Sequence, residues 1–345
     1  MTTQAITSEV GQAELEAARL LLARMGISPA DLLSTAPTRP LAPTFAEYVP
    51  IVAKTVSEAS RRSYGSYWKK IVDQWGGRRL NEPTASDVKL LGEYVRANVV
   101  VRANARGGRS AVENYLTALR CIYNQAVADG LVGEADNPAA KVAKPRRLRS
   151  TRHAVPDARL VEINQVAATT GNDPALDTLL LRLHIETACR RGGALALRPA
   201  DLDPGQCLIL LWEKGETQRW HPVSPTLMAH LQSHARERNA PADGRLLRYR
   251  DGRPITHRRY DHLWQRLGQH LPWVATQQVS THWLRHTTLT WVERNFSYAT
   301  ARAYAGHADA DNTATTTTYV RADIHEVAAA LAVLTGEPHP LAVHS

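Results

Sequence analysis

The sequence predicts a mainly α-helical protein with one small β-sheet, divided into two folded blocks. Three observations indicate this: amphipathic helical stripes in the first block, a strand–turn–strand pattern in the second, and a basic run between them. The 345 residues, 43% of them hydrophobic, suffice for two domains with buried cores. We divide the chain into 1–43, 44–140, 141–153, 154–336 and 337–345.

Residues 44–140 carry the patterns of the first block. Within 57–75, apolar side chains recur every three or four positions, which indicates a helix with one buried face; they are Tyr64, Tyr67, Trp68, Ile71 and Trp75. Further helices are expected at 87–98 and 110–129, the second ended by Gly130. Most of the aromatic side chains are expected in the core, which leaves the neighbouring basic residues on the surface as the expected contacts for a partner.

Residues 1–43 stand apart from this block. A helix rich in leucine and alanine is expected at 13–25, ended by Gly26, and three prolines then indicate a linker. The helix could be a contact helix or a loosely held terminal one.

Residues 154–336 mix helices with a small sheet. Strands are expected at 207–212 and 219–223, and the turn between them holds Lys214. Helices are expected at 157–170, 174–188, 226–237, 256–270, 282–295, 298–305 and 323–334. The last helix could dock on a neighbouring copy or pack on its own domain.

The charge balance indicates a polyanionic partner. Lys and Arg number 42 against 33 Asp and Glu, a net charge of +9. Nucleic acid is the first candidate for this partner, and an anionic membrane surface is the second. The alternative is a basic protein that has no polyanionic partner. The run 141–153 has six Lys and Arg and no acidic residue, so it is expected to lie on a phosphate backbone or to be a solvated charge run.

Cysteine usage and apolar run lengths suggest a cytoplasmic protein. Cys121, Cys189 and Cys207 form neither a disulfide framework nor a zinc-knuckle spacing. The longest apolar runs are too short to span a bilayer, and the first residues do not resemble an export signal. No membrane partner is expected.

Two segments contain side chains that could bind a phosphate. Arg190 follows an apolar helix and precedes two glycines, and a guanidinium can donate two parallel hydrogen bonds to a phosphate; an ordinary surface arginine is the alternative. His282 and Arg285 share one face of a helix. A metal site formed by His282 and His286 is disfavoured, because the motif has no acidic residue and no obvious third ligand.

Lys214 and Tyr319 would complete a reaction centre. A lysine at a turn can protonate a leaving oxygen when nearby arginines lower its pKa, although most turn lysines are simply solvated. A phenol, whose ordinary pKa is about 10, needs surrounding positive charge to become a nucleophile. His307, which follows Gly306, is a further candidate beside Tyr319.

These segments together resemble the tyrosine recombinase family, the phage-type integrases and Xer-like resolvases. Residues 187–190 resemble the first arginine box of the family, 282–287 its His-x-x-Arg box, and 305–307 with Tyr319 its terminal box. Segments upstream resemble the core-binding domain of the family, so that the resemblance covers roughly residues 44–325.

The resemblance implies a fold and an activity. The fold is an all-helical SAM-like core-binding domain followed by an α+β catalytic domain. The activity is site-specific cutting and rejoining of double-stranded DNA through a 3′-phosphotyrosyl link, by a homotetramer near the nucleoid, without metal or ATP. The catalytic residues implied are Arg190, Lys214, His282, Arg285, His307 and Tyr319. The DNA contacts expected are Arg61, Arg62, Lys69, Lys70, Arg109, Arg120, Lys144, Arg146 and Arg147.

The sequence departs from the family pattern in three places. The interval from His307 to Tyr319 is longer than usual, Trp283 stands where an acidic residue is common, and Gly193 replaces a usual glutamate. No arm-type DNA-binding domain is expected within 1–43. The alternatives are a type IB topoisomerase-like enzyme and a non-catalytic DNA-binding protein of the same fold.

Overall fold

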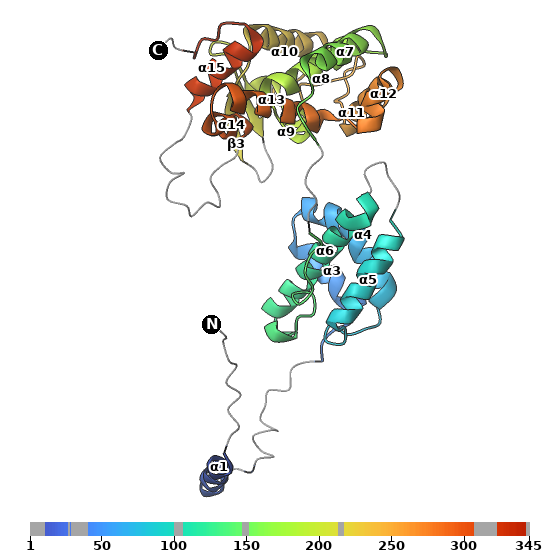
Figure 1. The fold of residues 1–345 in the computed structure, drawn as a ribbon, viewed down its shortest axis with the longest axis vertical. Helices are drawn as coiled ribbons and strands as arrows, with labels where there is room; N and C mark the ends of the chain where they lie inside the picture. The colour runs from blue at the N-terminus through green and yellow to red at the C-terminus, as the bar shows by residue number, and fades with distance from the viewer. Residues whose placement is uncertain are drawn as a thin grey trace. The chain divides into compact units, whose positions relative to one another are not determined.

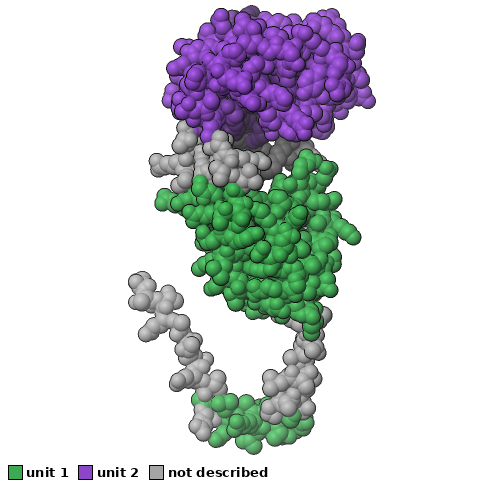
Figure 2. All heavy atoms as spheres, turned by 90° about the vertical axis from the view of Figure 1, so that its right-hand side faces the viewer, with its two compact units in different colours: residues 1–148 green, residues 149–345 purple. Residues whose placement is uncertain are grey.

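The computed structural model describes residues 11–26, 28, 41–99, 106–146, 152–212, 217–306 and 323–342. The chain divides into two compact units, 1–148 and 149–345 (Figures 1 and 2). The division falls within the basic run 141–153. In the first unit, helix α1 (Gln12–Arg24) lies where the sequence predicts a helix, and its Leu15, Leu20 and Leu21 side chains are exposed.

The core of the first unit lies among four helices. These are α3 (Phe45–Thr55), α4 (Glu58–Trp75), α5 (Ala85–Ala97) and α6 (Arg109–Ala128). Trp68, Ile71 and Trp75 are buried, as the predicted stripe on α4 requires. Tyr115 and Tyr123 are fully buried on α6, and each phenol donates a hydrogen bond to a main-chain carbonyl, at 3.1 and 3.0 Å. Such bonds satisfy the polar end of a buried tyrosine.

The second unit contains the sheet. Strands β1 (Leu202–Asp203), β2 (Leu208–Trp212) and β3 (Gln218–Pro222) pair antiparallel in that order. The predicted hairpin is therefore confirmed, whereas β1 was not predicted. The described helices are α7 (Asp157–Thr169), α8 (Pro174–Thr187), α9 (Arg191–Ala196), α10 (Pro225–Glu237), α11 (His257–His270), α12 (Pro272–Gln277), α13 (Thr281–Asn295), α14 (Tyr298–Ala305) and α15 (Ile324–Thr335).

Helix α8 is the central element of the second unit. It packs against α7, α10 and α13 and is buried along most of its length (Figure 1). Helix α15 packs against α14, α8 and β3, and its Val327, Ala330 and Leu331 are buried in one cluster with Tyr304 and Val292. Of the two placements expected for the last helix, the structure has the one on its own domain.

None of the helices described is both long and apolar enough for a bilayer crossing.

Candidate active site

A hollow of about 620 Å³ lies where the N-terminal ends of α9 and α13 approach α11. Arg190, His282 and Arg285 all line it, so three predicted catalytic residues from segments nearly 100 residues apart come together. The other lining residues are Cys189, Arg191, Gly192, Tyr260, Asp261, Trp264, Ser280 and Thr281.

Arg190 is positioned by the turn between α8 and α9. Helix α8 ends at Ala188, whose φ of 48° is left-handed, and Arg190 then caps α9 in an extended conformation. His184 holds this turn, with Nδ1 at 3.1 Å from the carbonyl oxygen of Cys189 and Nε2 at 3.0 Å from the hydroxyl of Tyr260. Burial lowers the pKa of His184 to about 4, so the ring is neutral at pH 7 and needs no counter-ion.

Arg285 is held at the base of the hollow by main-chain carbonyls. Its side chain is 5% exposed; Nη1 donates to the carbonyl oxygen of Ala188 and Nη2 to that of Ala305 at 2.8 Å. A guanidinium has five N–H donors, so these two bonds do not exhaust it. They fix its plane at the junction of α8, α13 and α14.

His282 is exposed at the wall of the hollow. Partial desolvation lowers its pKa, and the positive charges of Arg152, Arg285, His286 and Arg190 lower it further. The imidazole is therefore neutral at pH 7, which is the form that can accept a proton.

Among the described residues that line the hollow, cationic side chains outnumber anionic ones. Of the described residues that line it, Asp261 alone is a carboxylate, and it pairs with Arg191 at 3.5 Å while both side chains are largely exposed. Arg190, Arg285 and the nearby Arg152 add to this excess. Such an arrangement favours a bound anion with several oxygen acceptors, such as a phosphodiester.

A metal site gains no support in the described parts of the chain. They contain no group of three or more His, Cys, Asp or Glu side chains that could hold an ion. The ring of His286 instead contacts Thr290 Oγ1, at 3.0 Å from its Nδ1.

Lys214, His307 and Tyr319 lie outside the described residues, but the elements that flank them are described. Lys214 belongs to the connection between β2 and β3. His307 directly follows Gly306, the left-handed cap of α14, and Tyr319 precedes α15.

Two departures from the family pattern have a packing explanation. Trp283 is 5% exposed in a hydrophobic cluster, with its ring 5.1 Å from that of His153. Gly193 is buried against β2, where an added Cβ would lie 3.2 Å from the carbonyl oxygen of Trp212. The Trp283 side chain therefore serves apolar packing, and the close main chain of β2 leaves little room for a side chain at Gly193.

The predicted DNA contacts differ in their surroundings. Six of the basic residues are exposed: Arg61, Arg62, Lys69, Arg109, Lys144 and Arg146. Arg62 pairs with Glu58 at 2.6 Å, and Lys70 donates to the carbonyl oxygen of Asn98 at 3.3 Å. Arg147 lies outside the described residues.

Arg120 has a structural function within its own unit. Its Nε donates to the carbonyl oxygen of Ala139 at 3.1 Å and its Nη2 to that of Val142 at 2.8 Å. These bonds hold the segment that leads into the basic run.

Sequence reasoning missed His184, Tyr260 and Arg152 as parts of the site. Arg152 belongs to the basic run, and its charge lowers the pKa of His282, but no local pattern in the sequence places the two near each other. Nothing in the sequence signals the contact between His184 and Tyr260, which lie 76 positions apart.

The phage integrase family model matches residues 156–326. Tyrosine recombinase XerC of Xanthomonas axonopodis pv. citri is 29% identical over 236 residues, covering 66% of this chain and 73% of that protein. XerC of Xylella fastidiosa strain M23 is 28% identical over 264 residues, covering 74% and 83%.

Solved structures with the same fold include a lambda integrase tetramer bound to a Holliday junction and the Tn1549 transposon integrase bound to circular intermediate DNA. The first has a TM-score of 0.60 at 12% identity, covering 90% of this chain and 92% of that one. The second has a TM-score of 0.59 at 15% identity, covering 82% and 97%.

Proposed function

Because the chain belongs to the tyrosine recombinase family, we propose that it recombines double-stranded DNA at specific sites through a 3′-phosphotyrosyl link to Tyr319. The observation that carries the residue assignment is the hollow in which Arg190, His282 and Arg285 meet among more cationic than anionic side chains.

Arg190 and Arg285 would bind the non-bridging oxygens of the scissile phosphate. Both guanidiniums line the hollow, and two carbonyls fix the plane of Arg285 before DNA arrives. Donors that are already oriented stabilise the charge of the pentacoordinate transition state without reorganising during the reaction. Charge neutralisation by arginine is the task that a metal ion performs in other phosphotransfer enzymes, so this chemistry needs none.

The remaining groups would move protons. The Tyr319 oxygen attacks phosphorus, the bond to the 5′-oxygen breaks, and Lys214 protonates that oxygen. Neutral His282 accepts the phenol proton, and His307 donates a hydrogen bond to a phosphate oxygen. The 5′-hydroxyl of another strand then attacks in reverse and releases Tyr319. One phosphodiester replaces another of similar energy, so ATP is not required.

The proposed partners are attachment-site DNA and further copies of this chain. The exposed basic residues of the first unit, among them Arg61 and Lys69, supply salt-dependent phosphate contacts. The lambda integrase neighbour is a tetramer on a Holliday junction, and we propose the same assembly here.

Covalent trapping tests this function. The chain is incubated with a nicked duplex that carries its attachment site, and protein–DNA adducts are separated on a denaturing gel. Wild type is expected to form an adduct with or without EDTA, and Tyr319→Phe to form none. An adduct that persists in Tyr319→Phe contradicts the nucleophile, and loss of the adduct in EDTA contradicts metal independence. Strand exchange between two duplexes then separates a recombinase from a topoisomerase.

A further inference from the structure

The C-terminal end of α14 is where the chain departs toward His307 and Tyr319. Helix α14 ends at Ala305, and Gly306 caps it with a φ of 65°. An added Cβ on Gly306 would lie 2.2 Å from Nε of Arg219, so this end also packs closely against β3. The placement of this helix end therefore sets where the segment that carries the proposed nucleophile begins.

Tyr304 connects this helix end to the end of α8. Its side chain is fully buried, and its hydroxyl donates a hydrogen bond to the main-chain carbonyl oxygen of Glu186. Its ring packs edge-on against His221, with the ring centroids 4.7 Å apart. Burial raises the pKa of Tyr304, which keeps the hydroxyl protonated as a donor.

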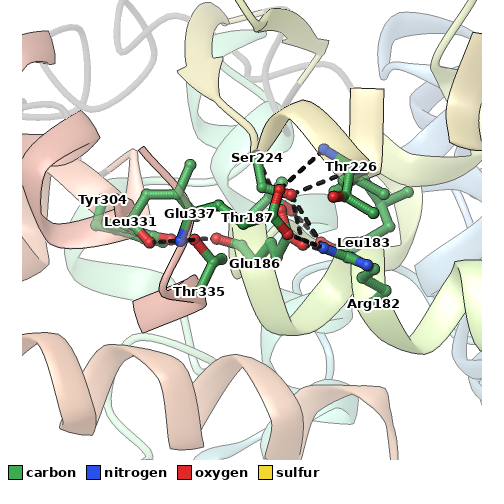
Figure 3. Close-up of polar contacts among 11 residues, drawn as sticks. Arg182, Leu183, Glu186, Thr187, Ser224, Thr226, Tyr304, Leu331, Thr335 and Glu337 are labelled. Carbon is green, nitrogen blue, oxygen red and sulfur yellow. Dashed lines mark hydrogen bonds and ion pairs between the residues drawn. The ribbon is translucent and has the colours of Figure 1, made fainter. Parts of the chain in front are cut away.

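The side chain of Glu186, whose main-chain carbonyl accepts this bond, belongs to a network of polar contacts, as Figure 3 shows. The carboxylate of Glu186 accepts hydrogen bonds from Ser224 N and Ser224 Oγ, both at 3.0 Å, and from Nε of Arg182 at 2.6 Å. Arg182 also pairs with Glu337 at 2.7 Å, and Thr226 N donates to that second carboxylate at 3.0 Å. The network fixes the main chain of α8 four residues before Arg190.

Arg285 connects the same two helix ends, because it donates to Ala188 at the end of α8 and to Ala305 at the end of α14. Tyr304 thus supplies a second link between them, and it lies outside the residues that line the hollow. A change at Tyr304 can therefore disturb the helix ends without removing a group that faces the phosphate.

We propose that Tyr304 is a positioning residue for strand cleavage: its hydrogen bond to Glu186 fixes the end of α14, and with it the start of the Tyr319 segment, relative to the Arg190–Arg285 phosphate site. This inference rests on the function proposed above. Misplacing a reacting group by about 1 Å costs on the order of a hundredfold in rate. Loss of the Tyr304 bond therefore slows cleavage and leaves DNA affinity unchanged.

The test compares Tyr304→Phe with Tyr123→Phe. Each variant removes one buried hydroxyl that donates to a main-chain carbonyl, but Tyr123 bonds Leu80 in the first unit. Single-turnover cleavage of the nicked substrate is measured beside DNA affinity. Tyr304→Phe is expected to cleave about tenfold to a hundredfold more slowly, with a Kd within about twofold of wild type. Tyr123→Phe is expected to cleave at the wild-type rate.

A substrate with sulfur in place of the bridging 5′-oxygen separates positioning of the nucleophile from leaving-group chemistry. A thiolate leaves without protonation, so this substrate is expected to restore cleavage by Lys214→Ala. It is not expected to restore Tyr304→Phe, because the defect there lies in the approach of Tyr319.

Amide hydrogen exchange shows whether the effect is local. In Tyr304→Phe, exchange is expected to become faster at residues 303–306 and to stay unchanged in α13. Faster exchange throughout the second unit would make Tyr304 a general structural residue and overturn the proposal.

Wild-type cleavage by Tyr304→Phe, an equal loss of affinity and rate, or rescue by the sulfur substrate would each overturn the proposal as well. Failure of wild type itself to form an adduct would instead reject the proposed function, and this inference with it.

Discussion

The second unit buries arginine in two regions that differ in the acceptors described for it. Around Asp177, Arg259 is 6% exposed and donates from Nε at 2.7 Å to the carboxylate, which Arg266 also contacts. In the hollow, Arg285 is 5% exposed, and the acceptors described for it include the carbonyls of Ala188 and Ala305. Equal burial therefore accompanies different acceptors, a carboxylate in one region and main-chain carbonyls in the other.

The difference separates an arginine that a carboxylate holds in the fold from one that main-chain carbonyls orient at the wall of the hollow. Removing one member of a buried arginine–carboxylate pair is strongly destabilising. Main-chain carbonyls orient a guanidinium through their dipoles, without a formal negative charge, which suits an arginine that also binds a phosphate. Three measurements test this difference.

The largest effect is expected when the Asp177 region loses Arg259. Arg259→Met removes a buried guanidinium that donates hydrogen bonds to Asp177, Asn172 and the carbonyl oxygen of Asp173, although Arg266 still pairs with Asp177. The free energy of unfolding is therefore expected to fall by about 4 kcal/mol. Urea denaturation measures this change. Cleavage per folded molecule should stay near wild type. A loss of cleavage without a loss of stability would mean that Arg259 acts in the reaction and not in the fold.

Protonation of His184 would introduce an unpaired charge beside the hollow. Its pKa is about 4 in the folded protein against an ordinary 6.5, so only the unfolded chain takes up this proton between those values. Stability is therefore full above about pH 6.5 and falls toward pH 4, by about 3 kcal/mol from this group.

Denaturation at several pH values measures the slope, and His184→Gln serves as the control because His234 also has a pKa lowered to about 4. The control should show a shallower dependence on pH. An unchanged slope would mean that His184 does not stay neutral in the fold.

In the hollow, replacing the guanidinium of Arg285 should lower the cleavage rate more than the stability of the fold. Arg285→Lys keeps the charge but cannot bond both carbonyls and a phosphate with the same geometry. Its single-turnover cleavage rate is expected to fall about a hundredfold. Arg266→Lys, in the Asp177 region, is the matched control and should cleave as wild type does. Equal rate losses in the two variants would contradict the comparison.

The sequence predicted most of the long elements because their signals are local, but the eleven-residue helix α3 was not predicted. The apolar stripe of α4 lies within the helix itself, at residues such as Trp68 and Trp75. Helices α9 and α12 have six residues each, and β1 has two, too few for a periodic pattern. Motif order also predicted that Arg190, His282 and Arg285 belong to one site, and the structure brings these three together.

The supports of the site could not be predicted. Tyr304 bonds Glu186 across 118 positions, and Arg285 bonds Ala188 across 97. Such bonds depend on where two helices end in space, and no local residue pattern encodes this. The bonds of Arg120 to the 139–142 segment could not be predicted either. From the sequence, Arg120 was predicted only as a DNA contact.

Mass spectrometry of the trapped adduct shows directly whether Tyr319 is the nucleophile. After nuclease and protease digestion, one nucleotide-bearing peptide, modified at Tyr319, is expected from wild type with EDTA present. The peptide is expected to disappear in Tyr319→Phe. A nucleotide on another tyrosine, or an adduct that forms only with added metal, would show that the proposed chemistry is wrong.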